Sequence, residues 1–290
     1  MPSLPGAVTA PAPSAIEAPR FPWPYLLWFG VLLVACYAPV LDNITHEWHA
    51  SDDMGHGLFV PLIAGYIVWE RRGELLAQPV RRSGWGLLLI AWGAVQACLG
   101  ALGAEIFVQR AAFMISLYGV TWYFAGTRVV RILAFPLLLL WFMIPIPGII
   151  YKQVTFPLQL LASRLAEVGL EVLGYTVLRE GNILELAGQQ ISVVEACDGI
   201  RALFSLSFFS LAYAYFFHPK VWMRWVMLVA TVPVAVIANC SRVVLTGIVG
   251  EHDVKLAQGF LHGFSGWIIF VVAIGMLMVI HKAVSLCFRR

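Results

Sequence analysis

Long apolar segments constrain this chain more than any other feature of its sequence. Eight of them stand out, at about 24–42, 54–69, 84–104, 109–126, 129–147, 199–217, 221–240 and 264–286. Most reach the roughly 20 residues that a helix needs to cross a hydrocarbon core of about 30 Å. Charged residues make up only 12% of the chain, about half their share in soluble domains. The sequence therefore predicts an all-α polytopic membrane protein with about eight transmembrane helices.

The distribution of Lys and Arg predicts how these helices are oriented. If the N-terminus is cytoplasmic, the inner segments hold twelve of the 19 basic residues and only three of the 16 acidic residues. Cytoplasmic loops of membrane proteins carry an excess of Lys and Arg. This charge distribution favours a multi-pass protein with both termini in the cytoplasm.

One stretch, residues 148–198, differs from the apolar spans. Residues 155–175 place apolar side chains at helical spacing with charges between them, which is typical of an amphipathic helix at a membrane interface. The residues that follow alternate over short stretches, with turn signals at Gly181-Asn182 and at Gly188, and predict two or three short strands. We expect a disordered cytoplasmic tail, five transmembrane helices, this extracytoplasmic insertion before the sixth helix, and three further helices, with bounds 1–20, 21–147, 148–198 and 199–290.

Three polar residues lie at the outer ends of three consecutive spans. Cys197 precedes the sixth span, Arg242 follows the seventh, and His262 precedes the eighth. A thiol near a helix N-terminus gains from the helix dipole, which favours the thiolate. An Arg can stabilise the oxyanion of a tetrahedral intermediate, and a His can transfer a proton to a leaving amine. The predicted topology thus brings a nucleophile, an oxyanion stabiliser and a general acid/base to one depth.

The residues next to Cys197 modify this hypothesis. Gly199 lets a backbone approach closely. Asp198 disfavours the thiolate unless a cation such as Arg201 pairs with it. A disulfide between Cys197 and Cys240 is the alternative, because the topology places Cys240 near the same face.

Further candidates support the site or bind the substrate. Asn239 precedes Arg242 by three residues, so it shares a helical face with it and is expected to orient the guanidinium. Arg179 and Lys152 are candidates to bind a carboxylate of the substrate. The chain has no HExxH motif, and its five cysteines form no CxxC pair, so we expect neither a metal site nor a cofactor.

At these residues the sequence resembles the exosortases, which are polytopic membrane cysteine enzymes convergent in chemistry with sortases. The segments "EACDGIR", "ANCSRV" and "HGFSGW" are similar to the family's cysteine, arginine and histidine motifs, in the same order and spacing. Upstream, "IPIPG", "TFPLQLLAS" and "REGN" resemble its segment before the cysteine, and "HGLFVPL" (56–62) resembles its early HG motif. The resemblance covers most of residues 50–285. Asp198 departs from the Ser or other small residue common in the family and marks a subgroup.

The resemblance implies a bacterial inner-membrane cysteine protease or transpeptidase whose active site is on the periplasmic side. Its substrates would be exported proteins with a C-terminal tail of the PEP-CTERM type, which comprises a Pro-Glu-Pro-type motif, one transmembrane helix and a basic cluster. The enzyme would cut near the motif and pass the substrate to a lipid-linked or polysaccharide-linked acceptor, releasing it toward the envelope or exopolysaccharide. Cys197, Arg242 and His262 match the catalytic positions, and nothing implies a nucleic-acid partner.

Two alternatives remain open. The segment "GFSG" (263–266) matches the GxSG motif of rhomboid-like intramembrane serine proteases, with Ser265 as nucleophile. However, His281 lies on the same predicted helix, roughly 24 Å from Ser265 by helical rise, and close helix packing also explains the glycines. A non-enzymatic transporter or lipid-handling protein is the other alternative, although nearly all ionisable residues lie at the ends of the spans rather than within them.

Overall fold

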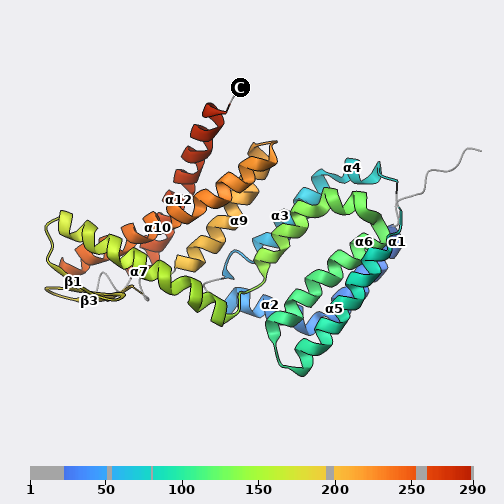
Figure 1. Ribbon diagram of the computed structural model, residues 1–290, viewed down its shortest axis with the longest axis horizontal. Coiled ribbons are helices and arrows are strands. Elements are labelled where there is room, and N and C mark those ends of the chain that lie inside the picture. Colours follow the sequence, from blue (N-terminus) through green and yellow to red (C-terminus); the bar gives the residue numbers. More distant parts are fainter. Residues whose placement is uncertain (1–22, 51–53, 80, 194–198, 253–259, 289–290) are drawn as a thin grey trace, which may run out of the picture.

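The computed structural model describes residues 23–50, 54–79, 81–193, 199–252 and 260–288 (Figure 1). Most of this chain is helical. The helices are α1 (Trp23–Cys36), α2 (Ala38–Ala50), α3 (Phe59–Glu70), α4 (Arg72–Leu76), α5 (Gly84–Leu102), α6 (Ile106–Leu139), the 3-10 turn η2 (Leu140–Met143), α7 (Gly148–Val172), α9 (Gly199–Phe217), α10 (Val221–His252) and α12 (Phe260–Cys287). Between α7 and α9 lie three strands, β1 (Val177–Glu180), β2 (Ile183–Leu186) and β3 (Gln190–Ser192).

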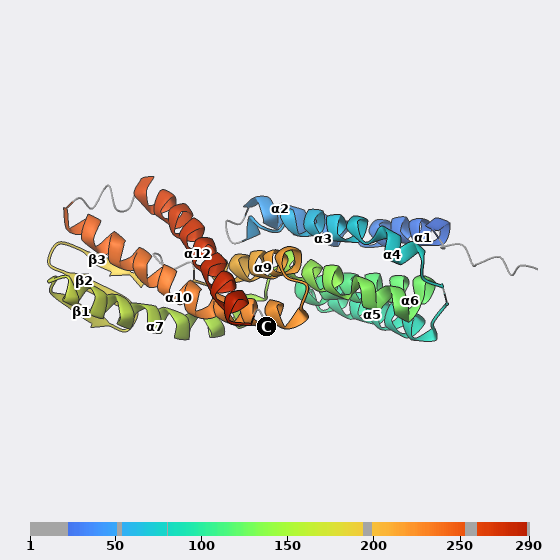
Figure 2. The same ribbon diagram turned by 90° about the horizontal axis from the view of Figure 1, so that it is seen from above.

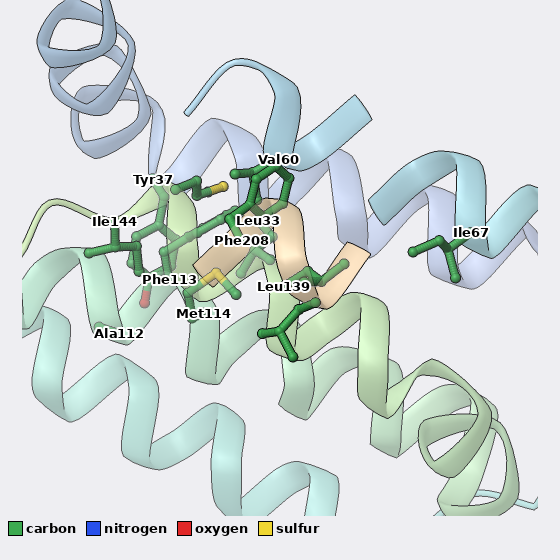
Figure 3. Close-up of a cluster of buried hydrophobic side chains, with 12 residues drawn as sticks. Leu33, Tyr37, Val60, Ile67, Ala112, Phe113, Met114, Leu139, Ile144 and Phe208 are labelled. Atoms are coloured by element: carbon green, nitrogen blue, oxygen red, sulfur yellow. The ribbon is translucent and has the colours of Figure 1, made fainter. Parts of the chain in front are cut away.

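Helix α9 joins two groups of elements, α1–α6 on one side and α7, the strands, α10 and α12 on the other (Figures 1 and 2). Phe208 and Leu211 of α9 are buried in a cluster with residues of α1, α3 and α6, including Val60 (Figure 3). Leu206 and Ala214 of the same helix are buried instead against α10 and α12. Since both faces of α9 are packed, its position is determined by both groups.

Among the described residues, four helices are long and apolar enough to cross a membrane: Gly84–Leu102, Ile106–Met143, Val221–Glu251 and Gly266–Cys287. A fifth span arises if α1 and α2, which are bent by 72° at their junction, cross together. Helix α3 and the segment Leu203–Phe217 are apolar but shorter. The chain is therefore a multi-pass membrane protein, and the number of eight spans is not confirmed.

Helix α6 contains a sharp break at Gly126, where the sequence predicted the boundary between the spans 109–126 and 129–147. Gly126 has φ 85° and ψ 172°, which are not helical values. A Cβ at this position would collide with the carbonyl oxygen of Arg81, and the positive φ also favours glycine. The chain turns back at this break, so that the second part of α6 runs toward α9 (Figure 1).

Helix α10 is longer than the sequence predicted. The expected span ended at residue 240 with Arg242 just outside it, whereas the helix continues to His252. The physical reason is that apolar residues continue to Val249 without a helix breaker after Pro233, and Arg242 is the one charged side chain between residues 225 and 250. Arg242 therefore lies within the helix, ten residues before its end.

The insertion before α9 contains the expected helix and strands. Helix α7 begins at Gly148, seven residues earlier than predicted, and buries one face that includes Gln159, Ala162, Ala166 and Leu170. The strands form an antiparallel sheet in the order β1-β2-β3. Its first turn is at Gly181-Asn182, as predicted, and Gly181 has φ 66°.

Candidate active site

Arg242 of α10 lies directly against Gly266 of α12. The Arg242 side chain is buried, with 7% of its surface exposed. A Cβ built on Gly266 would be 3.3 Å from both Cζ and Nη2 of Arg242, and 3.7 Å from Nη1. Gly266 therefore presents bare backbone to the guanidinium, and a side chain at this position would press on it.

This contact brings Arg242 close to the helical turn that carries His262. His262 lies in the first turn of α12, four residues before Gly266, which is about one helical turn. Residues at this spacing lie on one side of a helix. The His262 and Ser265 side chains themselves lie outside what the structure describes.

In the sequence, Cys197 lies between two residues that the structure describes. Cys197 and Asp198 fall outside the described residues, but Val193 and Gly199 on either side of them are placed. Val193 is fully buried, and its backbone N–H donates to the carbonyl oxygen of Asn182 at 2.8 Å. In the sequence, Cys197 follows Val193 by four residues and precedes the start of α9 by two.

The anchor before Cys197 packs on the part of α10 that contains Arg242. Val193 and Ile191 are buried in one cluster with Leu170 of α7 and with Val243, the residue after Arg242. Leu184 and Leu186 of β2 complete the apolar face of the sheet in this cluster. The sheet thus connects the chain leading to Cys197 with the turn of α10 that carries Arg242.

A polar contact fixes the sheet further along α10. Gln189, in the turn between β2 and β3, donates from Nε2 to the carbonyl oxygen of Gly247 at 2.7 Å. A Cβ at Gly250, two residues before the end of α10, would collide with the same Gln189 side chain. Gly250 therefore leaves room for the glutamine that docks the sheet.

His56, the histidine of the HG pair, has a specific place in the structure. It is buried, with 5% of its surface exposed. Its Nε2 lies 3.2 Å from the carbonyl oxygen of Phe142, and its Nδ1 lies 2.9 Å from Oγ of Ser205 in α9. A carbonyl can only accept, so Nε2 carries the proton and Nδ1 accepts from Ser205. His56 thereby ties the N-terminal group to α9, eight residues after Cys197.

The glycine of the HG pair, Gly57, is required by close packing against Trp48. A Cβ at Gly57 would collide with the indole ring of Trp48, and the Nε1 of that indole donates to the carbonyl oxygen of Met143 at 3.0 Å. Gly57 and His56 therefore both hold the chain against η2. The signal in the sequence was the HG pair itself, but its partners are far away along the chain.

Asn239 and Cys240 precede Arg242 in α10 by three and two residues. Asn239 is buried and lines a small pocket between α7, α9 and α10, together with Leu158 and Leu203. Its proposed role in orienting the guanidinium stays a prediction. Cys240 packs against the cluster that contains Val193. Its pairing with Cys197, the disulfide alternative, lies outside the described residues.

The remaining candidates are placed as follows. Arg179 of β1 donates from Nε to Oε2 of Glu167 in α7 at 2.6 Å, so it has a partner within the insertion. Lys152 is exposed in the first turns of α7. Gly199 begins α9, and the Arg201 side chain is not among those described. Substrate binding by Arg179 and Lys152 stays a prediction.

Comparison with known proteins agrees with the resemblance found in the sequence. The model of the transmembrane exosortase family matches residues 48–279. Neither the curated proteins nor the solved structures gave a match. The matched range includes the HG pair, the insertion, and the helices that carry Arg242 and His262. The chain therefore belongs to the transmembrane exosortase family.

Proposed function

We propose that this chain is a cysteine protease or transpeptidase that cleaves C-terminal PEP-CTERM-type sorting tails of exported proteins. The contact of Arg242 with Gly266, one turn from His262, is the observation that carries this proposal. The packing of Val193 next to Val243 supports it, because Cys197 lies four residues beyond Val193. In this proposal three segments of the chain bring a thiol, a guanidinium and an imidazole to one region.

The burial of Arg242 suits a role in stabilising negative charge. An arginine in an apolar membrane helix is costly and usually functional. Its guanidinium stays charged in such a medium, and a fixed charge acts more strongly there than in water. The packing against Gly266 holds the guanidinium in place before the reaction begins, which lowers the reorganisation needed in the transition state.

In the proposed mechanism the Cys197 thiolate attacks the carbonyl carbon of the scissile peptide bond. A C–S bond forms, and Arg242 stabilises the oxyanion of the tetrahedral intermediate. The intermediate then collapses, the C–N bond breaks, and His262 donates a proton to the leaving amine. An acceptor amine, hydroxyl or water then attacks the thioester carbonyl and gives its proton to His262, and the C–S bond breaks to release the Cys197 thiolate.

The arrangement fits a substrate that is itself anchored in the membrane. One transmembrane helix in the sorting tail would hold its cleavage site at the membrane surface, at the depth of Arg242 and His262. In this proposal both termini are cytoplasmic, the site faces the periplasm of a bacterial inner membrane, and the acceptor is lipid-linked or polysaccharide-linked. Arg179 and Lys152 are the candidates to bind a substrate carboxylate.

The experiment is co-expression with a reporter that ends in a PEP-CTERM-type tail, followed by an immunoblot of cut and uncut reporter. We expect Cys197→Ala and His262→Ala to leave the reporter uncut, and Arg242→Ala to slow cutting by at least about 10²-fold. Ser265→Ala and Cys240→Ser are the controls, and both retain processing. Normal cutting by Cys197→Ala refutes the mechanism, and loss of cutting in Ser265→Ala alone favours a serine protease.

A further inference from the structure

Two arginines meet on one tyrosine at the other end of α10. Arg71, which follows α3, donates from Nε to the Tyr215 hydroxyl at 2.6 Å. The guanidinium of Arg224, in the first turn of α10, lies 4.7 Å from the Tyr215 ring centroid and 4.6 Å from that of Phe135. The two rings stack with centroids 4.6 Å apart. Side chains from α6, α9, α10 and the residue after α3 thus form one cluster. We name its two arginines the Arg71–Arg224 pair.

This pair has less negative charge nearby than its two guanidiniums need. In the described part of the chain, the pair's one ion-pair partner is Glu74, whose Oε2 is 3.9 Å from Nη1 of Arg71 and whose side chain is 64% exposed. Within the described part of the chain, Arg224 forms no ion pair, and its Nε is buried without a hydrogen-bond partner. Cation–π contacts offset only part of the cost of bringing two like charges together. The cluster therefore has the composition of an anion site.

The surroundings of the pair indicate a membrane–water interface. Tyr66, Trp69 and Phe216 lie beside it and are largely exposed, with ring centroids of Tyr66 6.0 Å from Trp69 and 5.8 Å from Phe216. Tyr and Trp concentrate where lipid headgroups meet hydrocarbon. Arg224 and Arg242 are 18 residues apart in α10, about 27 Å by helical rise, which is close to the thickness of a hydrocarbon core.

We propose that the Arg71–Arg224 pair binds the phosphate of an anionic phospholipid. Two guanidinium forks match the geometry of phosphate oxygens, and Arg224 Nε supplies a donor that lacks an acceptor. With Glu74 the cluster keeps a net positive charge, so it favours a headgroup without an ammonium of its own. The bound lipid would join α3 to α9 and α10, at the end of α9 that is remote from Cys197. This site is independent of the proposed peptidase activity.

The test measures lipid binding to the purified protein in detergent by native mass spectrometry. The probes are phosphatidylglycerol, phosphatidylcholine with the same acyl chains, and inorganic phosphate. We expect wild type to retain phosphatidylglycerol in preference to both others. Arg224→Gln keeps much of the side-chain length and should weaken phosphatidylglycerol binding roughly ten- to hundredfold. Arg128→Gln is the matched control, because Arg128 is an exposed arginine outside the cluster, and it should bind like wild type.

Arg71→Gln provides a second variant from a different element in case Arg224→Gln does not fold, and it should weaken binding to a similar extent. Unchanged phosphatidylglycerol affinity in the folded variants overturns the proposal. An equal loss in Arg128→Gln also overturns it, because binding would then reflect general charge. Binding of inorganic phosphate as tight as that of phosphatidylglycerol would identify a site for soluble anions instead of lipid.

Discussion

A methyl group at Gly266 tests whether Arg242 must be held in place. Gly266→Ala adds a Cβ that would lie 3.3 Å from Cζ and Nη2 of Arg242. That distance is closer than an ordinary van der Waals contact, so the guanidinium must move by a few tenths of an ångström. Catalytic groups act within about 0.5 Å of their productive position, and a displacement of about 1 Å costs around 10²-fold in rate. We expect processing to fall several-fold in Gly266→Ala, and by 10²-fold or more in Gly266→Leu.

The stability of Gly266→Ala should not fall together with its activity. Gly in a helix is less favourable than Ala by roughly 0.5–1 kcal/mol. Gly266→Ala gains that increment, and the displaced guanidinium offsets part of it, so the free energy of unfolding should stay within about 1 kcal/mol of wild type. Loss of activity without loss of stability is the expected result.

Gly275 offers a matched control on the same helix. A Cβ at Gly275 meets nothing within 4 Å, so Gly275→Ala should stabilise α12 slightly and leave processing unchanged. Reporter cleavage in cells measures activity, and thermal unfolding in detergent measures stability. If Gly266→Ala processes the reporter as fast as Gly275→Ala, or if it loses activity only in proportion to lost stability, the argument about Arg242 is wrong.

Three further predictions follow from contacts around the site. Gly250→Ala displaces the glutamine that docks the sheet, and we expect thermal unfolding to show a loss of about 1 kcal/mol. His56→Phe leaves the Ser205 hydroxyl and a carbonyl unpaired, and should cost about 1–3 kcal/mol in the same assay, more than Ser205→Ala. In a double-mutant cycle of stability, Arg179→Gln and Glu167→Gln should couple by less than about 1 kcal/mol. If Arg179→Gln slows reporter cutting and Glu167→Gln does not, Arg179 is assigned to substrate binding.

Features with local causes could be predicted from the sequence. The span 199–217 coincides with α9, because a glycine begins the apolar run and the segment His218-Pro219-Lys220 ends it. The turn at Gly181-Asn182 was predicted because its geometry needs a residue that tolerates positive φ. The glycines of "GFSG" were expected to allow close packing, and Gly266 does so, although its partner is a guanidinium.

Features that depend on distant partners could not be predicted. The length of α10 beyond residue 240 depends on a buried Arg242, and hydropathy alone treats an arginine as the end of a span. The contact between His56 and Ser205 joins residues 149 positions apart. Neither periodicity nor charge counting contains information about such a pair, so the role of the HG pair became visible only in the folded chain.

These distant contacts explain what the N-terminal helices contribute to the candidate site. None of the candidate catalytic residues lies before α7, yet the segment that contains α1–α6 contacts α9 near both of its ends. His56 binds Ser205 in the half of α9 that follows Cys197, and Arg71 binds Tyr215 near its end. Between these contacts Phe208 is fully buried against the N-terminal group (Figure 3). Because the other face of α9 packs on α10 and α12, the N-terminal group helps to fix the position of α9 against the helices that carry Arg242 and His262.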